Sequence, residues 1–256
     1  MRINHNITAL NTHRNMTINN LAVSKNMEKL ASGLRINRAA DDAAGLSISE
    51  VMRGQIRALE QGQRNAQDGI SYVQTAEGAM NEVSAMLVRM KELKIQWSNG
   101  TYSTIDKQNI SKEIDELGEQ IKEIMTKTTF NGISITRGIT IYYFDNDNTV
   151  IAIDSIDTSA FLELNSQTTL ASINDAIKAV AQERAKLGAK QNRLEYTVNN
   201  LGTTIENLTA SESRIRDTDM AKEMVELTKN SILLQAAQAM LSQANLQPQG
   251  VLSLLG

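Results

Sequence analysis

The chain offers few side chains that could bind a metal or act as a nucleophile. His5 and His13 are the only histidines, and cysteine is absent. Their spacing places both histidines on roughly one face of a helix, but no further ligand accompanies them, so a polar surface or interface role fits better than a metal site. No serine lies in a nucleophile elbow. The sequence therefore predicts neither a metal centre nor a catalytic nucleophile, and no cofactor.

Acidic residues cluster at two places. Asp41 and Asp42 are adjacent, so their carboxylates point in different directions and do not form a facing acid–base pair. Charged turn or cap residues are the plainer interpretation. The segment 145–149 (DNDNT) resembles the start of a calcium loop, but it lacks the glycine and the distal glutamate that such a loop requires. A turn between two strands fits it better, and we expect no enzyme activity.

Basic residues also fall short of a binding site. Arg53, Arg57 and Arg64 share one helical face with Glu60, whereas a nucleic-acid stripe needs more positive charge and interleaved aromatics. The net charge of −3 points the same way. No window approaches the roughly 20 apolar residues of a membrane span, and the first residues do not form a secretory signal peptide. We therefore expect neither nucleic acid nor membrane as a partner. The arginine face is better interpreted as an ionic surface that is solvated or lies between subunits.

The elements that carry these residues are long helices. From Ile173 to Ile215, alternating steps of four and three meet apolar residues at ten of thirteen positions. Such a repeat places one stripe along a helix against which a partner helix can pack. Shorter stripes predict helices over 46–96 and 105–127, with a turn at 97–101 around Asn-Gly. Three helices with a reversal between the first two suggest a bundle.

The middle of the chain has a different pattern. Residues 139–144 and 150–153 are β-branched and aromatic, with a polar run between them, which predicts a β-hairpin. Elsewhere aromatic residues are scarce and the chain has a single proline, which favours thin seams between long helices. The predicted fold class is mainly α, an elongated helical bundle or coiled coil with a small β-hairpin region.

Both ends of the chain, residues 1–40 and 220–256, are helix-prone and carry apolar faces. A terminal helix with such a wide apolar face frays unless something covers it. We expect these faces to pack against the opposite terminus and against neighbouring copies of the chain. The residues expected to drive polymerisation are Ile3, Ile7, Leu10, Leu233, Ala237, Met240, Leu241, Leu252 and Leu255.

Several long motifs, in a fixed order, resemble those of bacterial flagellins, in a short form without variable outer domains. They are residues 31–37 (ASGLRIN), 40–46 (ADDAAGL), 64–71 (RNAQDGIS), 74–79 (QTAEGA), 129–132 (TFNG), 213–221 (SRIRDTDMA), 243–245 (QAN) and 251–255 (VLSLL). The resemblance covers nearly all of the chain outside about 136–165. It implies a structural subunit that self-assembles into the flagellar filament for motility by head-to-tail packing of its terminal helices.

The resemblance also implies a domain organisation. Residues 1–43 and 217–256 would pair as helices of the filament's inner core, and 44–135 with 166–216 would form a three-helix rod. Residues 136–165 would be the short hairpin region that replaces the outer domains. A hook–filament junction protein, which has similar ends but does not polymerise extensively, remains the alternative. A secreted enzyme on flagellin-like ends would need an inserted catalytic domain, for which the middle is too short.

Partners and location follow from the same resemblance. It implies export through the flagellar type III apparatus to the extracellular filament, without a cleaved signal peptide. The implied partners are other copies of the chain, an export chaperone at the carboxyl-terminal segment, a filament cap protein and hook–filament junction proteins. It also implies recognition by Toll-like receptor 5 through Arg89, Leu93 and Glu113. Apart from the resemblance, these three belong to a charged helix face in which Leu93 is an exposed apolar residue.

Overall fold

The computed structural model describes residues 6–144 and 149–255, with side chains described as far as Gln247. The chain forms two compact units. The terminal unit consists of the residues up to Gly54 together with those from Leu208 onward, and the central unit consists of Gln55–Asn207. The predicted class, mainly α with a small β-region, is confirmed.

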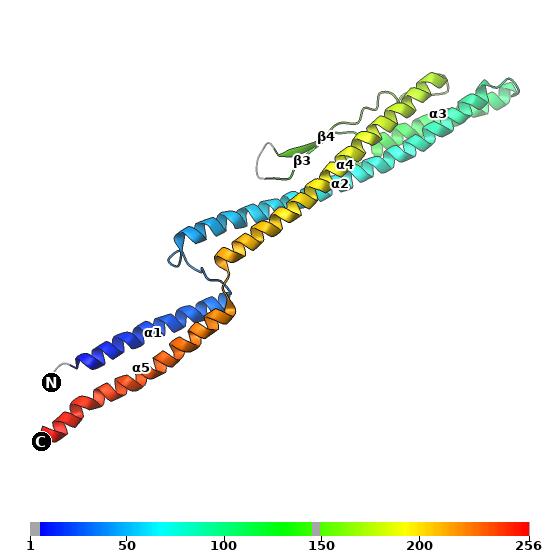
Figure 1. The fold of residues 1–256 in the computed structure, drawn as a ribbon. Helices are drawn as coiled ribbons and strands as arrows, with labels where there is room; N and C mark the ends of the chain where they lie inside the picture. The colour runs from blue at the N-terminus through cyan, green and yellow to red at the C-terminus, as the bar shows by residue number, and fades with distance from the viewer. Residues whose placement is uncertain (1–5, 145–148, 256) are drawn as a thin grey trace. The chain divides into compact units, whose positions relative to one another are not determined.

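The central unit is built on three long helices, the first and third of which extend into the terminal unit, and these helices lie side by side in Figure 1. They are α2 (Ala43–Ser98), α3 (Thr104–Lys127) and α4 (Leu170–Arg216), and each boundary lies within three residues of its prediction. The predicted turn separates α2 from α3. Ser103 caps α3, because its hydroxyl accepts the Asp106 N–H at 3.2 Å while the Asp106 carboxylate accepts the Ser103 N–H at 3.1 Å.

A seam of buried side chains along α2 forms the core of the central unit. It continues in steps of three and four, or of seven as their sum, the spacing that keeps one side of a helix against its neighbours. Its members are Leu59, Ala66, Val73, Ala76, Met80, Val83, Leu87 and Met90. On α3 the buried positions are Ile110, Ile114, Gly118, Ile121 and Met125. The predicted α3 stripe is therefore correct at three positions, while Leu117 and Ile124 pack at its edge.

Two small antiparallel pairs supply the β-structure. Strands β3 (Ile139–Tyr142) and β4 (Val150–Ile153) pair with Ile139 opposite Ile153, which confirms the predicted hairpin. Its predicted polar tip, 145–148, lies outside the described residues. Strands β1 (Thr129–Phe130) and β2 (Ile133–Ser134) form a second hairpin. The turn between them has positive φ at both Asn131 (51°) and Gly132 (78°), the backbone that the Asn-Gly dipeptide favours.

Tyr72 joins the β-structure to α2. Its ring packs edge-on against Phe130 with the centroids 6.1 Å apart, and its hydroxyl donates to the Arg137 carbonyl oxygen at 2.7 Å. Burial raises the pKa of the Tyr72 hydroxyl, because an ionised phenolate would lose its water there. The neutral hydroxyl therefore holds the backbone that leads into β3 against the helix.

Glycines on α2 and α3 allow the segments above them to approach closely. A Cβ on Gly62 would overlap the carbonyl oxygen of Tyr143, and one on Gly69 would overlap the side chain of Ile141. On α3, a Cβ on Gly118 would overlap the carbonyl oxygen of Leu164. The hairpin and the segment after it thus sit directly on helix backbone.

We expect Gly62→Ala to destabilise the central unit by about 1–3 kcal/mol, because the hairpin backbone must move away from the added methyl group. Gly78 is the matched control: it lies in the same helix, and nothing is within 4 Å of an added Cβ. Gly78→Ala should therefore stabilise the central unit by about 0.5–1 kcal/mol through helix propensity alone. Urea unfolding of the monomer, followed by the fluorescence of Trp97, measures both. Equal effects of the two substitutions would contradict the close approach at Gly62.

Candidate functional site

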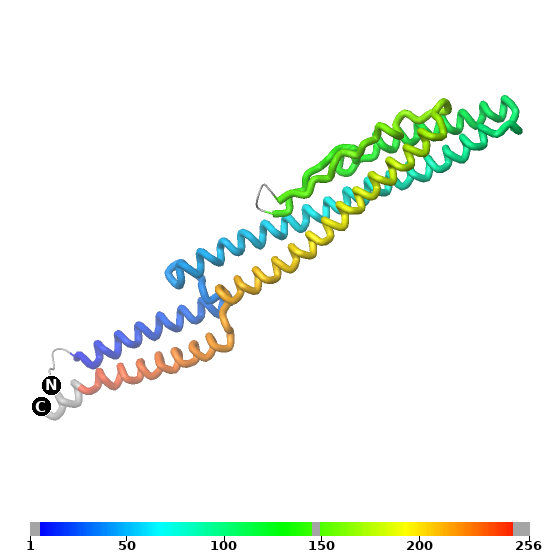
Figure 2. The backbone as a smooth tube through the Cα atoms, turned by 45° about the horizontal axis from the view of Figure 1, so that its top comes forward, coloured from blue at the N-terminus to red at the C-terminus, as the bar shows by residue number. Residues whose placement is uncertain are grey.

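The terminal unit contains one pair of long helices, α1 (Ile7–Ser32) and α5 (Met220–Leu255), which run side by side in Figures 1 and 2. The pairing is antiparallel. The Asn6 side chain donates to the Ala244 carbonyl oxygen at 2.7 Å, and at the other end Lys29 lies 3.8 Å from Glu223. The predicted pairing of the two chain ends is thus present within one chain.

The seam between α1 and α5 is narrow and only partly apolar. Among the described side chains of the two helices, only Asn26 and Ala244 are buried, at 8% exposure each. In the amide orientation that satisfies both of its groups, the Asn26 oxygen accepts the Leu227 N–H at 3.1 Å. Leucines such as Leu30, Leu227 and Leu234 are only partly buried, so the pair removes less apolar surface from water than a closed core does. The pair therefore has less stabilisation from its own packing than the central unit has.

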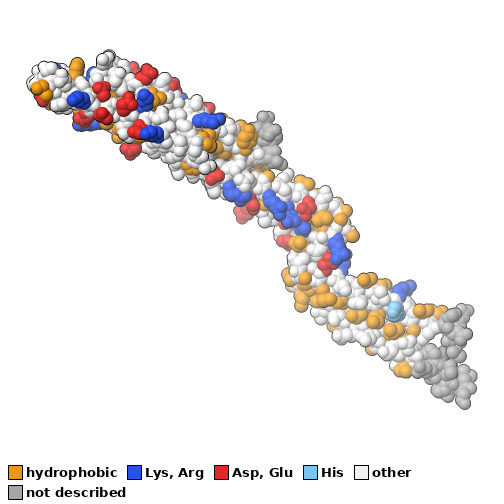
Figure 3. Space-filling view, turned by 180° about the vertical axis from the view of Figure 1, so that it is seen from behind, with side chains coloured by type: hydrophobic (Ala, Val, Ile, Leu, Met, Phe, Trp, Pro, Cys, Tyr) orange, Lys and Arg blue, Asp and Glu red, His pale blue; other side chains and the backbone are white. Residues whose placement is uncertain are grey.

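The large apolar side chains of these helices lie on the outside. On α1 they are Ile7, Leu10, Ile18, Leu21 and Met27, each between 52% and 68% exposed. On α5 they are Met220, Met224, Val225, Ile232, Leu233, Met240 and Leu246. Figure 3 shows such side chains gathered over the visible face of the helix pair, where charged groups are few. Exposed apolar patches of this kind mark surfaces that another molecule covers.

The residues predicted to drive polymerisation divide into two groups. Ile7, Leu10, Leu233 and Met240 are exposed, whereas Ala237 and Leu241 are partly buried on the same side of α5 as buried Ala244. Ile3 and the side chains of Leu252 and Leu255 lie outside the described residues. Ile18 and Leu21 belong to the exposed group and were missed by the prediction, although they continue the spacing that Ile7 and Leu10 begin.

A short crossing of two backbone segments closes the terminal unit beyond α1. Gly33 ends α1 with φ of 72°, so the helix stops well short of the expected residue 40. The Arg35 N–H then donates to the Arg216 carbonyl oxygen at 2.7 Å, and the Thr218 N–H donates to that of Gly33 at 3.0 Å. Arg216 also contacts the Glu50 carboxylate at 2.7 Å. The two backbone bonds join the end of α1 to the short connection between α4 and α5, and the Arg216–Glu50 ion pair joins the end of α4 to the first part of α2.

Asp41 and Asp42 are cap residues, as the sequence suggested. One Asp41 oxygen lies 2.7 Å from the Lys25 ammonium, and the other accepts the N–H groups of Asn37 and Arg38 at 3.2 Å. Asp42 accepts the Gly45 N–H at 2.9 Å in the first turn of α2. The hydrogen bond from Lys25 is the main cause that lowers the pKa of Asp41 to about 2 from 3.8.

The lowered pKa makes the 33–45 segment sensitive to acid. Because the folded state binds the Asp41 proton more weakly than the unfolded state, its stabilisation is complete above about pH 3.8 and is lost as the pH falls towards 2. We expect Asp41→Asn to remove this pH dependence of stability and to leave the backbone amides of the segment less protected from hydrogen exchange at neutral pH. Hydrogen–deuterium exchange of residues 33–45 between pH 2 and 5 measures the pH dependence. The exposed Asp175→Asn is the control, and an unchanged pH profile in Asp41→Asn would contradict the assignment.

The residues expected to contact a receptor are not all on the surface. Arg89 on α2 and Glu113 on α3 are exposed and paired, with the guanidinium Nη2 2.8 Å from the carboxylate, and this pair raises the pKa of Arg89. Leu93 is 2% exposed and belongs to the core. The expectation that Leu93 is exposed is therefore wrong. It follows Leu87 and Met90 along the buried seam of α2, and that seam decides its orientation.

Other candidate residues are ordinary surface groups. Arg53 pairs with Glu50 at 3.2 Å, and Arg64 donates to Gln61 on its own helix. His13 is exposed, while His5 lies outside the described residues. Within 6–144 and 149–255, no three acidic or histidine side chains come together to hold a metal. Over the same residues, no helix is long and apolar enough to cross a membrane.

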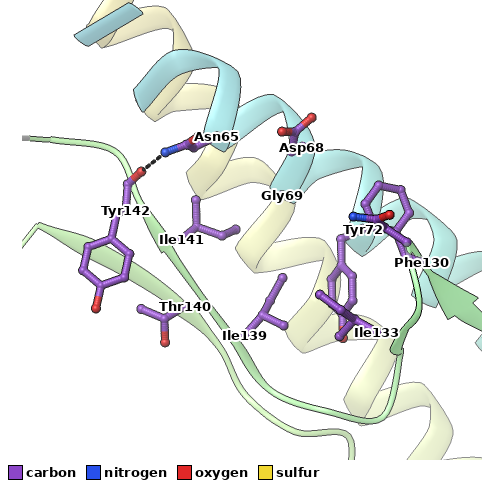
Figure 4. A pocket seen from close by; sticks show the side chains of 11 residues that line it. Asn65, Asp68, Gly69, Tyr72, Phe130, Ile133, Ile139, Thr140, Ile141 and Tyr142 are labelled. Atoms are coloured by element: carbon purple, nitrogen blue, oxygen red, sulfur yellow. Dashed lines mark hydrogen bonds between the residues drawn. The ribbon is translucent and has the colours of Figure 1, made fainter. Parts of the chain in front are cut away.

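A pocket lies between α2 and the β-structure (Figure 4). It has a volume of about 460 Å³ and is lined mainly by apolar and aromatic groups, including Tyr72, Phe130 and Ile141. Asn65 closes one side by donating to the Tyr142 carbonyl oxygen at 2.9 Å. Asp68 supplies the one ionisable carboxylate of the lining. This combination resembles no acid–base or nucleophilic constellation.

Comparison with known proteins identifies the family. Residues 3–140 match the bacterial flagellin N-terminal helical region, and residues 170–255 match the bacterial flagellin C-terminal helical region. The chain is 48% identical over 303 residues to flagellin of Bacillus subtilis and 50% identical over 271 residues to flagellin of Halalkalibacterium halodurans. It is 43% identical over 286 residues to the flagellar filament 33 kDa core protein of Treponema phagedenis. Each alignment covers all of both chains. The chain belongs to the bacterial flagellin family.

Proposed function

We propose that the exposed apolar faces of α1 and α5 are the surfaces through which this flagellin polymerises. Flagellins are structural subunits of the extracellular flagellar filament and not enzymes, so the open questions are which surfaces associate and with whom. The single observation that carries the proposal is the outward placement of large apolar residues such as Leu10, Leu21 and Met240. In a free subunit these side chains meet water, and a neighbouring copy would cover them.

The energetics favour repeated contacts between copies. Covering one such side chain contributes about 1.5–3 kcal/mol, whereas bringing two subunits together costs at least about 4 kcal/mol in lost freedom of motion. A single contact would therefore be weak, and a subunit that touches several neighbours would be held firmly. Head-to-tail contacts that do not close on themselves extend into a helical filament. We propose residues 1–43 and 217–256 as its inner core, 44–135 with 166–216 as the rod, and 136–165 as the short hairpin region.

Assembly of the purified chain alone tests this function. We expect abundant long filaments by electron microscopy when concentrated monomer is seeded with short filament fragments. A hook–filament junction protein would remain monomeric or form short aggregates under the same conditions, so this outcome would favour the alternative. The names of the related proteins, which include a filament core protein, support the filament subunit.

The auxiliary partners are part of the same proposal. Export through the flagellar type III apparatus requires the chain to pass in an unfolded state, and the narrow α1–α5 seam would open readily. An export chaperone would then cover the apolar face of the carboxyl-terminal segment before assembly. A cap protein would guide insertion at the tip, and junction proteins would hold the base.

We further propose that the Arg89–Glu113 surface is recognised by Toll-like receptor 5 when the subunit is monomeric. The two side chains are about half exposed and held in one geometry by their ion pair. The buried Leu93 would support this surface from beneath instead of touching the receptor.

Arg89→Ala should lower the response of receptor-bearing reporter cells to purified monomer by tenfold or more, the effect typical of an arginine at the centre of an interface. The fold should be unchanged, because an ion pair this exposed to water contributes little to stability. Lys112→Ala, an exposed neighbour of Glu113, is the matched control. Equal responses to Arg89→Ala and to the original chain would refute the assignment of this surface as the receptor-binding site.

A further inference from the structure

The methionines of this flagellin are distributed very unevenly between its two units. Four of the eleven are about half exposed, namely Met27, Met220, Met224 and Met240, at 52%, 48%, 51% and 62%. All four lie on α1 or α5. Three others are fully buried in the core of the central unit, namely Met80, Met90 and Met125, at 0% exposure each. The protein thus contains an exposed group and a buried group of the same side chain.

Exposure decides how a thioether reacts with an oxidant. A peroxide transfers one oxygen atom to the methionine sulfur, so the O–O bond breaks, an S–O bond forms and water leaves. The sulfur is oxidised by two electrons and the peroxide is reduced by two. No catalyst or cofactor is required, and methionine sulfoxide reductases reverse the reaction. The four exposed sulfurs are open to this attack, whereas the three in the core are shielded.

The sulfoxide changes the surface on which these residues lie. It replaces a polarisable apolar group with a polar one whose oxygen must accept hydrogen bonds. In a free subunit, water supplies those bonds. On α5, Met220 and Met224 lie one turn apart, and Leu233 lies two turns from Met240, so these thioethers share their helix faces with other exposed apolar side chains. A sulfoxide covered by another copy of the chain would therefore lose its water without gaining a donor.

We propose that Met27, Met220, Met224 and Met240 are oxidation sites at which peroxide-class oxidants block assembly of the free subunit. The proposal rests on the proposed function, because the thioethers matter only if assembly covers them. Oxidation would act on monomers, while subunits already in a filament would be shielded by their neighbours. Reduction of the sulfoxides would restore the capacity to assemble.

Hydrogen peroxide treatment of the full-length monomer tests the inference. Peptide mass spectrometry should find one added oxygen on each of the four exposed methionines and none on Met80, Met90 or Met125. Far-ultraviolet circular dichroism should be unchanged, and the concentration needed for seeded assembly should rise at least tenfold. Treatment with methionine sulfoxide reductases A and B should return that concentration to its starting value.

Substitutions assign the effect to these four residues. A chain with Met27, Met220, Met224 and Met240 all replaced by leucine, a swap that conserves volume, should need the same concentration for seeded assembly before and after peroxide, whatever that concentration is in the untreated variant. Met125→Leu, the control, should stay as sensitive as the original chain. Unimpaired assembly of the oxidised chain, or equal inactivation of the four-leucine variant, would overturn the proposal. If the four-leucine variant does not assemble at all, the reductases provide the test. The proposal is then overturned if they fail to restore assembly of the oxidised original chain. Failure of untreated chain to assemble would instead refute the proposed function.

Discussion

Removal of the last twenty residues, 237–256, is expected to abolish filament formation while leaving a folded, largely helical monomer. The deletion removes Met240 from the exposed face and Ala244 from the seam with α1. It also removes the acceptor of the Asn6 side chain at the amino-terminal end of α1. The first turns of α1 would then have no partner and would fray. Seeded assembly followed by electron microscopy measures the loss.

The central unit provides the internal control for this truncation. Its core is formed by α2, α3 and α4 together with the β-structure and the segment after it, and includes no described residue of the deleted segment. The urea midpoint reported by Trp97 should therefore be unchanged. Filaments from the truncated chain would show that the carboxyl-terminal part of α5 is dispensable for assembly.

Replacement of both Leu10 and Leu21 by serine is expected to raise the concentration needed for assembly by a hundredfold or more. These are the two most exposed leucines of α1, at 68% and 67%. Each would forfeit about 1.5–3 kcal/mol if a neighbouring copy covers it, and a factor of ten corresponds to about 1.4 kcal/mol. Sedimentation of seeded assemblies at a series of concentrations measures the shift.

The monomer should tolerate the same double substitution, because neither side chain packs within its own chain. Its circular dichroism should change little. The matched control replaces Asn15 and Asn20, which are also exposed on α1, by serine. The control should assemble like the original chain. Equal assembly by Leu10→Ser/Leu21→Ser and the control would mean that this face of α1 remains in water.

Hydrophobic spacing predicted the long helices well because their cores depend on it directly. The seam of α2 keeps steps of three and four over many turns, and α4 is buried at Ile173, Val180, Leu187 and Leu194 as its stripe predicted. One charged position of that stripe is also explained. Arg184 reaches the edge of the core, where it contacts Glu77 on α2 at 2.6 Å. Continuing the α2 pattern one step beyond Met90 would also have placed Leu93 inside.

The terminal helices were harder to predict, because α5 is apolar on more than one side. Leu233, Ala237 and Met240, all expected to drive polymerisation, are divided in the structure between an exposed and a less exposed side. A sequence pattern shows which residues avoid water, but it does not distinguish burial within the chain from burial between chains. The β1–β2 hairpin was missed although its Asn-Gly turn was a recognisable signal. The close approaches at Gly62 and Gly69 depend on tertiary contacts between distant segments.

Cryo-electron microscopy of filaments grown from the purified chain would show directly which surfaces hold the subunits together. We expect Ile7, Leu10 and Leu21 of α1, and Leu233 and Met240 of α5, to lie against neighbouring subunits in the assembled filament. Their side chains should be shielded from water there, in contrast to the free subunit. A filament in which these residues face solvent or an open channel, with the contacts made by other surfaces, would contradict this expectation.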